Sequence, residues 1–580
     1  MIARPKYLPR TALLPGLDRL RHYPSSWLRQ DCLAGVTVAA YLIPQCMAYG
    51  ELAGVGPVQG LWAILPALLI YTLVGTSPQL SVGPESSTAV MTAVAVAPLA
   101  ATSGTSYPVL ASLLACAVGL WCLVGYVARL GFLADLLSKP ILIGYMAGVA
   151  VIMIVGQLSR VSGVPIGAES VTGRLVDFVG QAQMAHGPTL AVGLLVLGFL
   201  FVVQARLPRL PGPLLAVLLA TPVVALLGLD QQGVQVVGAI PAGLPRLVVP
   251  LASWQEVGQI LTAAVGIAIV GYSDNVLTGR ALAARHRHTL DANQELLALG
   301  LANLGAGLMQ GFPVSSSASR AAIGDSLGSK SQVYSLAAFG VVMGVLLFLR
   351  PLLAMFPTAA LGALVIFAAT KLVDVAEFRR LQQFRRGDFA LALATTVGVL
   401  ATDLLVGVAI AVSLSGIELF ARIARPHDAV MGKVPNVAGL HDIADWPGAT
   451  TIPGLVIYRY DAPLFFANAI DFQRRALTAV AAETAPVEWL VINTEAIVEI
   501  DITAVDMLVE LYETLRQQGI TLALARVKHS LYVQLQQSGL LALIGVEHIF
   551  FTLPSAIDGF QQRQLSPPER DLTSQPPPAG

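Results

Sequence analysis

The sequence predicts a polytopic, all-α membrane domain followed by a small α/β domain. Hydrophobic residues make up 55% of the 580 residues and charged residues only 12%, whereas a soluble domain carries about 25% charged residues. Long apolar segments recur between Asp31 and Arg422. After Arg425 the pattern changes to short strands and amphipathic helices, which is typical of a soluble α/β domain. The formal net charge of zero gives no indication of a nucleic-acid partner.

The chain begins with a polar segment, residues 1–30, which lacks the short apolar core of a signal peptide. A membrane span needs roughly 20 apolar residues, and on that length the sequence predicts about fourteen spans within residues 31–424. The first seven lie at approximately 32–53, 58–75, 80–99, 107–128, 136–157, 188–205 and 212–229. The second seven lie at approximately 257–278, 289–309, 314–328, 332–349, 357–372, 387–402 and 404–421.

The loops on one side of these spans are richer in basic residues than the loops on the other side. The basic loops carry Arg129, Lys139, Arg206, Arg209, Arg280, Arg285, Arg287, Lys371, Arg379, Arg380, Arg385, Arg386, Arg422 and Arg425. Cytoplasmic loops of membrane proteins carry an excess of lysine and arginine. The sequence therefore predicts a multi-pass protein of the plasma or bacterial inner membrane with both termini in the cytoplasm.

The third span of each half is interrupted in the same way. "LSVGPESSTAVMTAV" (80–94) and "GFPVSSSASRAAIGD" (311–325) both read as an extended, proline-containing piece that opens into a serine-rich helix. An odd number of spans in each half places the halves in opposite orientations, which predicts two inverted seven-span repeats. Paired interrupted segments at matching places are typical of the midplane binding site of a transporter.

The two interrupted segments contain the candidate anion site. Helix N-termini bind anions through exposed amides and the helix dipole, and two opposed half-helices would point their N-termini at one place. Hydroxyl donors are supplied by Ser315, Ser316, Ser317 and Ser319, which flank Ala318, and on the other half-helix by Ser86. The alternative is that such small residues only pack one membrane helix against another.

Asp274 is the candidate coupling residue, because it stands inside an otherwise apolar span. An ionisable residue at such a depth costs ~2.5–3.5 kcal/mol on insertion scales and usually marks an ion or substrate path. Burial favours the protonated form of a carboxylate, so Asp274 is able to carry a proton. The alternative is a structural aspartate that is hydrogen-bonded to neighbouring backbone.

The C-terminal part is predicted to consist of a linker at 425–450, an α/β domain at 451–562 and a disordered tail at 563–580. Strand-like stretches are "GLVIYRY", "PLFFAN", "EWLVIN", "ITLALA" and "HIFF", and helices are expected near 469–482, 503–517 and 528–537. The tail is rich in Pro, Ser and Gln, a composition typical of disorder.

Four motifs in order resemble the sulfate permease (SulP) family of anion transporters. They are "AAYLIPQCMAYGELAGVGPVQGLW", "GTSPQLSVGPES", "GFPVSSSASR" and "FPTAALGALVIFAATKLVD". The C-terminal domain resembles the STAS domain of the same family. The resemblance implies a core domain (spans 1–4 and 8–11), a gate domain (spans 5–7 and 12–14), alternating access by movement of one against the other, a homodimer, and no cofactor.

The resemblance also implies roles for single residues. An acid at the place of Asp274 binds or replaces the coupling cation, and Thr278 matches the threonine one turn later in sodium-coupled bicarbonate members. Those members complete the sodium site with Gly-Ala-Thr in span ten. The aligned residues here are Ser316, Ser317 and Ala318, and the hydroxyl is displaced to Ser319. This departure argues against sodium and for a proton.

Further site residues follow from the same resemblance. Gln45, after the helix-breaking Pro44, matches a glutamine that faces the substrate. Tyr49 and Tyr272 are further candidates from the sequence, the alternative being aromatic side chains that only pack against neighbouring helices. Arg320 matches a basic residue that adds positive potential near the anion, the alternative being an arginine that snorkels to the cytoplasmic end. Glu85 lies at the matching place of span three and is expected to pair with Arg320 and partly neutralise it.

In the STAS domain, Ile502 occupies the position at which related anti-sigma antagonists carry a phosphorylated serine. Switching by that phosphorylation is therefore not expected. Thr503 is predicted to cap the helix that follows. The domain is then interpreted as a docking or dimer-stabilising module.

The leading functional hypothesis is sulfate uptake by proton symport. Sodium-coupled bicarbonate uptake and dicarboxylate transport are alternatives within the family, and an anion channel or sensor that signals through STAS is the alternative from another class. Asp274 argues against a channel, which needs no coupling acid. An enzyme is not expected, because the sequence has no P-loop, no Ser-His-Asp arrangement and no His/Cys metal cluster.

Overall fold

The computed structural model describes residues 14–135, 138–168, 170–207, 210–241, 243–401, 404–446 and 448–565. The chain divides into two compact units between Ser415 and Gly416. The first unit contains the apolar segments and is called the membrane unit here. The second unit contains the α/β domain.

The membrane unit is almost entirely helical. Its first elements are α1 (Pro15–Arg21), η1 (Ser25–Trp27), α2 (Leu28–Leu52), α3 (Pro57–Val74), β1 (Val82–Gly83), α4 (Ser86–Thr102), α5 (Tyr107–Val127), η2 (Leu130–Asp135), α6 (Lys139–Ser162), α7 (Val171–Gly180), η3 (Ala182–Met184), α8 (Gly187–Arg206) and α9 (Gly212–Leu226). The later elements are α10 (Trp254–His286), α11 (Ala292–Leu308), β2 (Ser315–Ser316), α12 (Ala318–Ser326), α13 (Val333–Phe348), α14 (Arg350–Ala354), α15 (Thr358–Thr370), α16 (Val375–Phe384), α17 (Arg386–Ala401) and α18 (Leu404–Ala424), which crosses the boundary between the units.

Each apolar segment predicted from the sequence overlaps one of these helices. By length and composition, 7 helices among the described residues are able to cross a membrane, and α4, α9 and α13 are shorter apolar helices. The chain is therefore a multi-pass membrane protein, while the number of spans and the inverted repeat stay predictions. Part of the predicted N-terminal segment is folded, because α1 packs on α3 and Arg19 Nη2 donates a hydrogen bond to the Thr76 carbonyl (2.5 Å).

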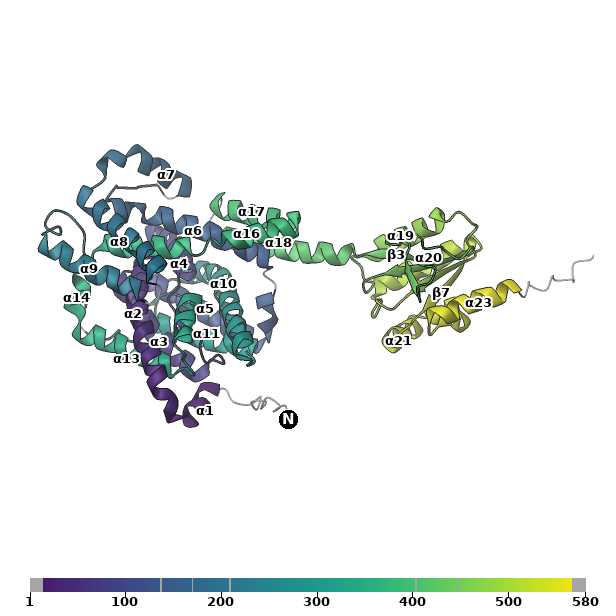
Figure 1. Ribbon diagram of the computed structural model, residues 1–580, viewed down its shortest axis with the longest axis horizontal. Helices are drawn as coiled ribbons and strands as arrows, with labels where there is room; N and C mark the ends of the chain where they lie inside the picture. Colours follow the sequence, from purple (N-terminus) through teal and green to yellow (C-terminus); the bar gives the residue numbers. More distant parts are fainter. Residues whose placement is uncertain are drawn as a thin grey trace, which may run out of the picture. The chain divides into compact units, whose positions relative to one another are not determined.

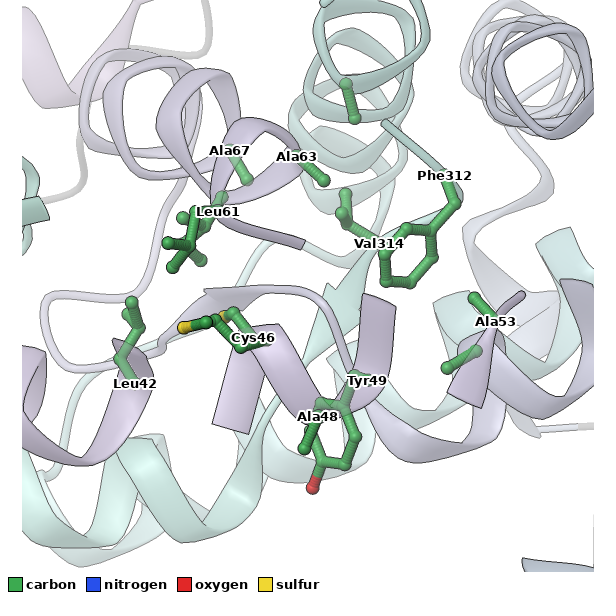
Figure 2. Packing of buried hydrophobic residues seen from close by; sticks show 14 of the residues in the cluster. Leu42, Cys46, Ala48, Tyr49, Ala53, Leu61, Ala63, Ala67, Phe312 and Val314 are labelled. Atoms are coloured by element: carbon green, nitrogen blue, oxygen red, sulfur yellow. The ribbon is translucent and has the colours of Figure 1, made fainter. Parts of the chain in front are cut away.

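Small residues let the central helices of this unit pack closely. Helices α2 and α3 lie against each other, as do α5 and α11 (Figure 1). A Cβ placed on Gly60 of α3 would lie 1.8 Å from the Cys46 carbonyl oxygen of α2. In Figure 2, Leu61 of α3 points toward Cys46, and Ala63 points toward Val314, which precedes β2. Close packing through small residues is the usual way in which membrane helices associate, and here it places α2 and α3 beside the interrupted segments.

The second unit is a six-stranded sheet with helices on both faces. It contains β3 (Asp428–Lys433), β4 (Leu440–Asp442), β5 (Leu455–Tyr460), α19 (Ala469–Ala482), β6 (Trp489–Asn493), α20 (Ile502–Gln517), β7 (Thr521–Ala525), α21 (His529–Gln537), α22 (Leu540–Ile544), η4 (Val546–His548), β8 (Ile549–Phe550) and α23 (Leu553–Leu565). The strand order is β4-β3-β5-β6-β7-β8. Strands β5 to β8 are parallel, and β3 is antiparallel to β4 and β5.

Alternating side chains divide the core of this unit into two layers. Val456, Leu490 and Leu522 face the layer that contains α19 and α20, whereas Leu455 and Val491 face the layer that contains α23. Because successive residues of a strand point to opposite faces, a run such as "GLVIYRY" serves both layers. The predicted strands and helices of this domain agree with the structure in type and order, with the exceptions described next.

Three expectations for the C-terminal part were wrong. Residues 425–450 are not only a linker, because β3 and β4 lie within them and form one edge of the sheet. Their polar and glycine-containing sequence shows no strand pattern, and β3 is held by pairing with β4 on one side and β5 on the other. "PLFFAN" does not form a strand, and its Leu464 makes only an isolated bridge to Ile500. The start of α20 is capped by Asp501 and not by Thr503.

The predicted disordered tail lies largely outside the described residues. Residues 563–565 still belong to the last turn of α23. The remaining domain boundaries stay predictions.

Candidate functional site

The two interrupted segments meet through a two-stranded antiparallel sheet. Strand β1 pairs with β2 in the register Val82 to Ser316 and Gly83 to Ser315. The Ser317 amide extends this pairing by donating a hydrogen bond to the Ser81 carbonyl (2.8 Å). Helices α4 and α12 begin within three residues of these strands. Because the strands are antiparallel, the two helices leave in opposite directions, and their N-termini face a common centre.

Neither helix start is capped by the side chain at its N-cap position. Glu85 precedes α4 and Ser317 precedes α12, and neither side chain accepts a hydrogen bond from a first-turn amide in the described structure. The first amides of any helix lack acceptors within the helix. Such amides, together with the positive end of the helix dipole, form a ready anion site.

A cavity of about 230 Å³ lies against both starts. Its polar wall combines Tyr41, Gln45 and Tyr49 of α2, which share one helix face at a spacing of four residues, with Glu85, Ser86, Ser317, Ala318 and Ser319. The rest of the lining is mainly apolar and comes from α8, α9 and α15, for example Leu200, Val203, Leu364 and Phe367. Gln204 and Lys371 also belong to the lining, and the Lys371 ammonium donates to Gln204 Oε1 (2.8 Å).

The structure thus brings together seven of the residues that the sequence singled out. They are Gln45, Tyr49, Glu85, Ser86, Ser317, Ala318 and Ser319. Three of them present unsatisfied or adjustable polar groups. Gln45 Oε1 is buried without a partner among the described residues, and the hydroxyls of Ser317 and Ser319 lie 3.1 Å apart. A buried polar atom without a partner costs ~1–3 kcal/mol, so a polar occupant of this cavity would be stabilised.

Ser315 and Ser316 form strand β2 but do not line the cavity. Both hydroxyls are buried and have no hydrogen-bond partner among the described residues. Their backbone forms the β1–β2 ladder instead. Their contribution is therefore to position the start of α12.

Arg320 lies behind the cavity wall and is fully buried. Its Nη1 donates to the Pro84 carbonyl (2.9 Å), its Nε donates to Ser81 Oγ (3.4 Å), and Nη1 lies 3.6 Å from Glu85 Oε2. The ion pair with Glu85 suggested by the sequence is therefore present. The alternative of a snorkelling arginine was wrong, because the side chain has no exposed surface.

Asp274 contacts the start of α4 without lining the cavity. The Ser87 hydroxyl donates to Asp274 Oδ2 over 3.4 Å, and the neighbouring Ser86 lines the cavity. One turn earlier on α10, a Cβ on Gly271 would lie 3.4 Å from Ser315 Cβ and 3.8 Å from Thr88 Cγ2. Thus α10 lies against the start of α4 and against β2, and its half-buried Asp274 and Thr278 share one face.

Tyr272 is not brought to this site. Its hydroxyl donates to the carbonyls of Gly131 and Ala292, at 2.8 Å in each case. The tyrosine therefore connects α10 to the segments before α6 and at the start of α11, and it takes no part in the cavity.

Sequence reasoning missed a second buried acid of the membrane unit, in addition to Asp274. Glu295 of α11 is fully buried and accepts hydrogen bonds from Asn275 Nδ2 (2.7 Å), Tyr71 Oη (2.9 Å), and the amide and hydroxyl of Thr76 (2.9 and 2.5 Å). A charge that is buried with a full set of donors is typical of a structural network. The sequence did contain a signal for this residue, because Glu295 is an ionisable residue inside the apolar segment 289–309.

Asn303 was missed as well, and it fixes the segment that leads into β2. Its Nδ2 donates to the carbonyl of Val314 (2.9 Å) and its Oδ1 accepts from the Val314 amide (2.9 Å). An asparagine in an apolar helix gives no signal of its distant partner, so only the fold reveals this contact.

Comparisons with known proteins agree with this architecture. A model of the sulfate permease family matches residues 28–395, and a model of the STAS domain matches residues 447–556. A probable sulfate transporter of Mycobacterium tuberculosis (strain H37Rv) is 51% identical over 549 residues, which cover 95% of this chain and 98% of that protein. The chloroplastic sulfate transporter 4.1 of Arabidopsis thaliana is 30% identical over 566 residues, which cover 94% of this chain and 82% of that protein.

Two solved structures share the fold. The murine Slc26a9 anion transporter in the inward-facing state gives a TM-score of 0.87 at 22% identity and covers 96% of this chain and 97% of that one. The transmembrane domain of the cyanobacterial bicarbonate transporter BicA gives 0.60 at 22% identity and covers 66% of this chain and 98% of that one. With a family model matching most of the membrane unit and a 51% identical relative aligned along nearly the whole of both chains, this chain belongs to the sulfate permease family and carries a C-terminal STAS domain.

Proposed function

We propose that the protein is a secondary active transporter that takes up sulfate together with protons by alternating access. The observation that carries this proposal is the cavity of about 230 Å³ that two opposed, uncapped helix starts share. Relatives named as sulfate transporters support sulfate as the substrate.

The anion would be held mainly by backbone and hydroxyl groups. Each helix start contributes about half a unit of positive charge, and Ser86, Ser317 and Ser319 offer hydroxyl donors at the cavity wall. Arg320 adds positive potential from behind, and Glu85 at 3.6 Å cancels part of it. Partial cancellation suits a transporter, because an anion that is bound too tightly would not leave.

Proton coupling would act through the contact between Asp274 and Ser87. A charged Asp274 beside the start of α4 opposes an anion held by the same helix start, whereas a protonated Asp274 does not. Proton and anion therefore stabilise each other's binding, which is the requirement for symport. Sodium is the second candidate, favoured by the one-turn spacing of Asp274 and Thr278, with bicarbonate or a dicarboxylate as its companion substrate.

The two walls of the cavity support movement of one domain against the other. The polar wall comes from α2, α4 and α12, which we assign to the core, and the apolar wall comes from α8, α9 and α15, which we assign to the gate. Sliding an apolar surface breaks few hydrogen bonds, so an elevator-like displacement of the core costs little free energy. We further propose that the termini are cytoplasmic and that the protein is a homodimer.

The experiment that tests this function is uptake by reconstituted protein in liposomes. Labelled sulfate and labelled bicarbonate are offered under an inward proton gradient or an inward sodium gradient. Proton-driven accumulation of sulfate is the expected result. Sodium-driven accumulation of bicarbonate would replace our first choice by the second, and passive flux without accumulation under either gradient would favour a channel.

A further inference from the structure

A second pocket, of about 300 Å³, lies beside the C-terminal end of α2. Its lining includes Glu51 and Leu52 of α2, Val90 of α4, Arg160 of α6 and Arg174 of α7. Among the described residues, its titratable lining groups are one acid and two arginines. We propose that Arg160 and Arg174 form a capture site for the transported anion on the outer side of the membrane, a proposal that rests on the function proposed above.

The second pocket continues the path of the central cavity along the same helix faces. On α2, Tyr49 lines the central cavity, and Leu52, three residues later, lines the second pocket. On α4, Ser86 lines the central cavity, and Val90, four residues later, lines the second pocket. Residues three or four apart lie on one helix face. The second pocket is therefore about one turn beyond the central cavity, and the loop charges assign this end of α2 to the outside.

The two arginines are held differently. Arg160 Nη2 lies 2.9 Å from Glu51 Oε1 and donates to the Glu51 carbonyl (3.1 Å), while Nη1 donates to Gln157 Oε1 (3.3 Å). Arg174 Nε donates to the Ala168 carbonyl (3.1 Å), and the guanidinium has no carboxylate partner among the described residues. One of the two positive charges is thus balanced, and the other is available to an anion.

The geometry of a guanidinium suits this task. Arginine presents several N–H donors in a planar fork that matches oxyanions, and paired positive charges in a pocket raise the local concentration of an anionic substrate. An oxyanion held by Arg174 would also compete with Glu51 for Arg160. Since the Glu51–Arg160 pair joins α2 to α6, that competition would loosen the contact between these two helices at the pocket.

The first test compares charge variants by sulfate uptake from the outside of intact cells. Arg174→Gln is expected to raise the KM for external sulfate by about fivefold or more and to leave the maximal rate within about twofold, in line with an electrostatic capture role. Arg174→Lys keeps the charge but loses the planar fork, so its KM should lie between those of the wild type and Arg174→Gln. Arg246→Gln removes an exposed arginine that does not line the pocket and serves as the control for general surface charge.

A second test reports occupancy without transport. Ile166→Cys places a thiol in the pocket lining, and a membrane-impermeant thiol reagent is added outside with and without sulfate. Sulfate should slow the labelling of Ile166→Cys, and the protection should disappear when Arg174→Gln is added. Protection should persist when Ser319→Leu is added, because that substitution affects only the central cavity. The unsubstituted chain, with its own four cysteines, gives the background.

The two tests separate this proposal from the proposed function. If the wild type accumulates no sulfate but sulfate still protects Ile166→Cys, the transport proposal fails and the capture site stands. If uptake occurs while Arg174→Gln leaves KM unchanged, or alters only the maximal rate, the capture site is refuted. Protection that survives Arg174→Gln would refute it as well.

Discussion

The starts of α4 and α12 at the membrane site differ from the start of α20 in the STAS domain. The difference lies in whether a side chain accepts hydrogen bonds from the first amides of the helix. At α20, Asp501 Oδ1 accepts from the Ala504 amide (2.8 Å), and Oδ2 accepts from the Phe466 amide (2.8 Å). At α4 and α12, the residues at the same position, Glu85 and Ser317, make no such bond in the described structure. The start of α20 has its acceptor within the protein, whereas the buried starts of α4 and α12 leave first-turn amides open to a ligand in the cavity.

Residue type does not explain this difference. Serine is among the best N-cap residues, yet the Ser317 hydroxyl lies 3.1 Å from the Ser319 hydroxyl and does not bond the helix amides. The β1–β2 pairing fixes the backbone before α12 and so decides where Ser317 points. The comparison therefore separates helix starts that serve stability from helix starts that serve binding, and the following substitutions test it.

The largest effect is expected from Arg320→Ala at the start of α12. Removing this fully buried arginine leaves Glu85 without its cation, and breaking a buried pair costs ~3–5 kcal/mol. We expect loss of sulfate uptake and a clear fall in the thermal stability of the detergent-purified protein. Arg379→Ala, an exposed arginine outside the cavity, is the control. Wild-type stability in Arg320→Ala would contradict the structural pairing.

Asp274→Asn should uncouple transport at the start of α4. The amide cannot carry a proton but keeps the shape of the side chain and its contact with Ser87. Accumulation against a gradient should fall on the order of 5–150-fold, the range of typical coupling energies, while downhill sulfate exchange and folding persist. Uptake and exchange in liposomes measure the two activities side by side. Accumulation at the wild-type level would make Asp274 structural.

Ser319→Leu should weaken sulfate binding at the start of α12. A bulky apolar side chain would fill the cavity beside the first-turn amides and remove one hydroxyl donor. We expect the KM for sulfate to rise about tenfold, or ~1.4 kcal/mol. Ser326→Leu, at the exposed far end of the same helix, is the matched control. An unchanged KM would remove Ser319 from the site.

Glu85→Gln is expected to act in the opposite direction. Glu85 lines the cavity and reduces the potential of Arg320, so neutralising it should tighten the binding of labelled sulfate by about two- to fivefold, or ~0.5–1 kcal/mol. Slower turnover should accompany the tighter binding. Equilibrium binding to purified protein measures the effect, and weaker binding would show that Glu85 helps to hold the anion.

The smallest effect is expected at α20, where the cap is purely structural. Asp501→Ala should lower the stability of the start of α20 by ~1 kcal/mol, and Thr503→Ala should change it little. Hydrogen exchange of the peptide that spans 501–517 would separate the two variants. Sulfate uptake should stay at the wild-type level in both. A larger loss of protection in Thr503→Ala would restore Thr503 as the capping residue.

The sequence by itself determined the class of protein and the region of the site. Three local features of the sequence carried this information: the length of the apolar segments, the change of pattern after Arg425 and the segments that contain proline and serine. They are local because burial in lipid and the periodicity of a helix or strand depend on consecutive residues. Those properties placed the helices of the membrane unit and most strands of the STAS domain. They also pointed to both helix starts and to Asp274.

Only the tertiary structure decided which side chains meet. It placed Ser317 and Ser319 at the cavity and Ser315 and Ser316 behind it, through a strand pairing that joins residues 82–83 to 315–316. It also buried Arg320 beside Glu85 and turned Tyr272 away. The physical reason is that these outcomes depend on contacts between segments more than 100 residues apart in the chain. No local pattern encodes the direction of a single side chain across such a separation.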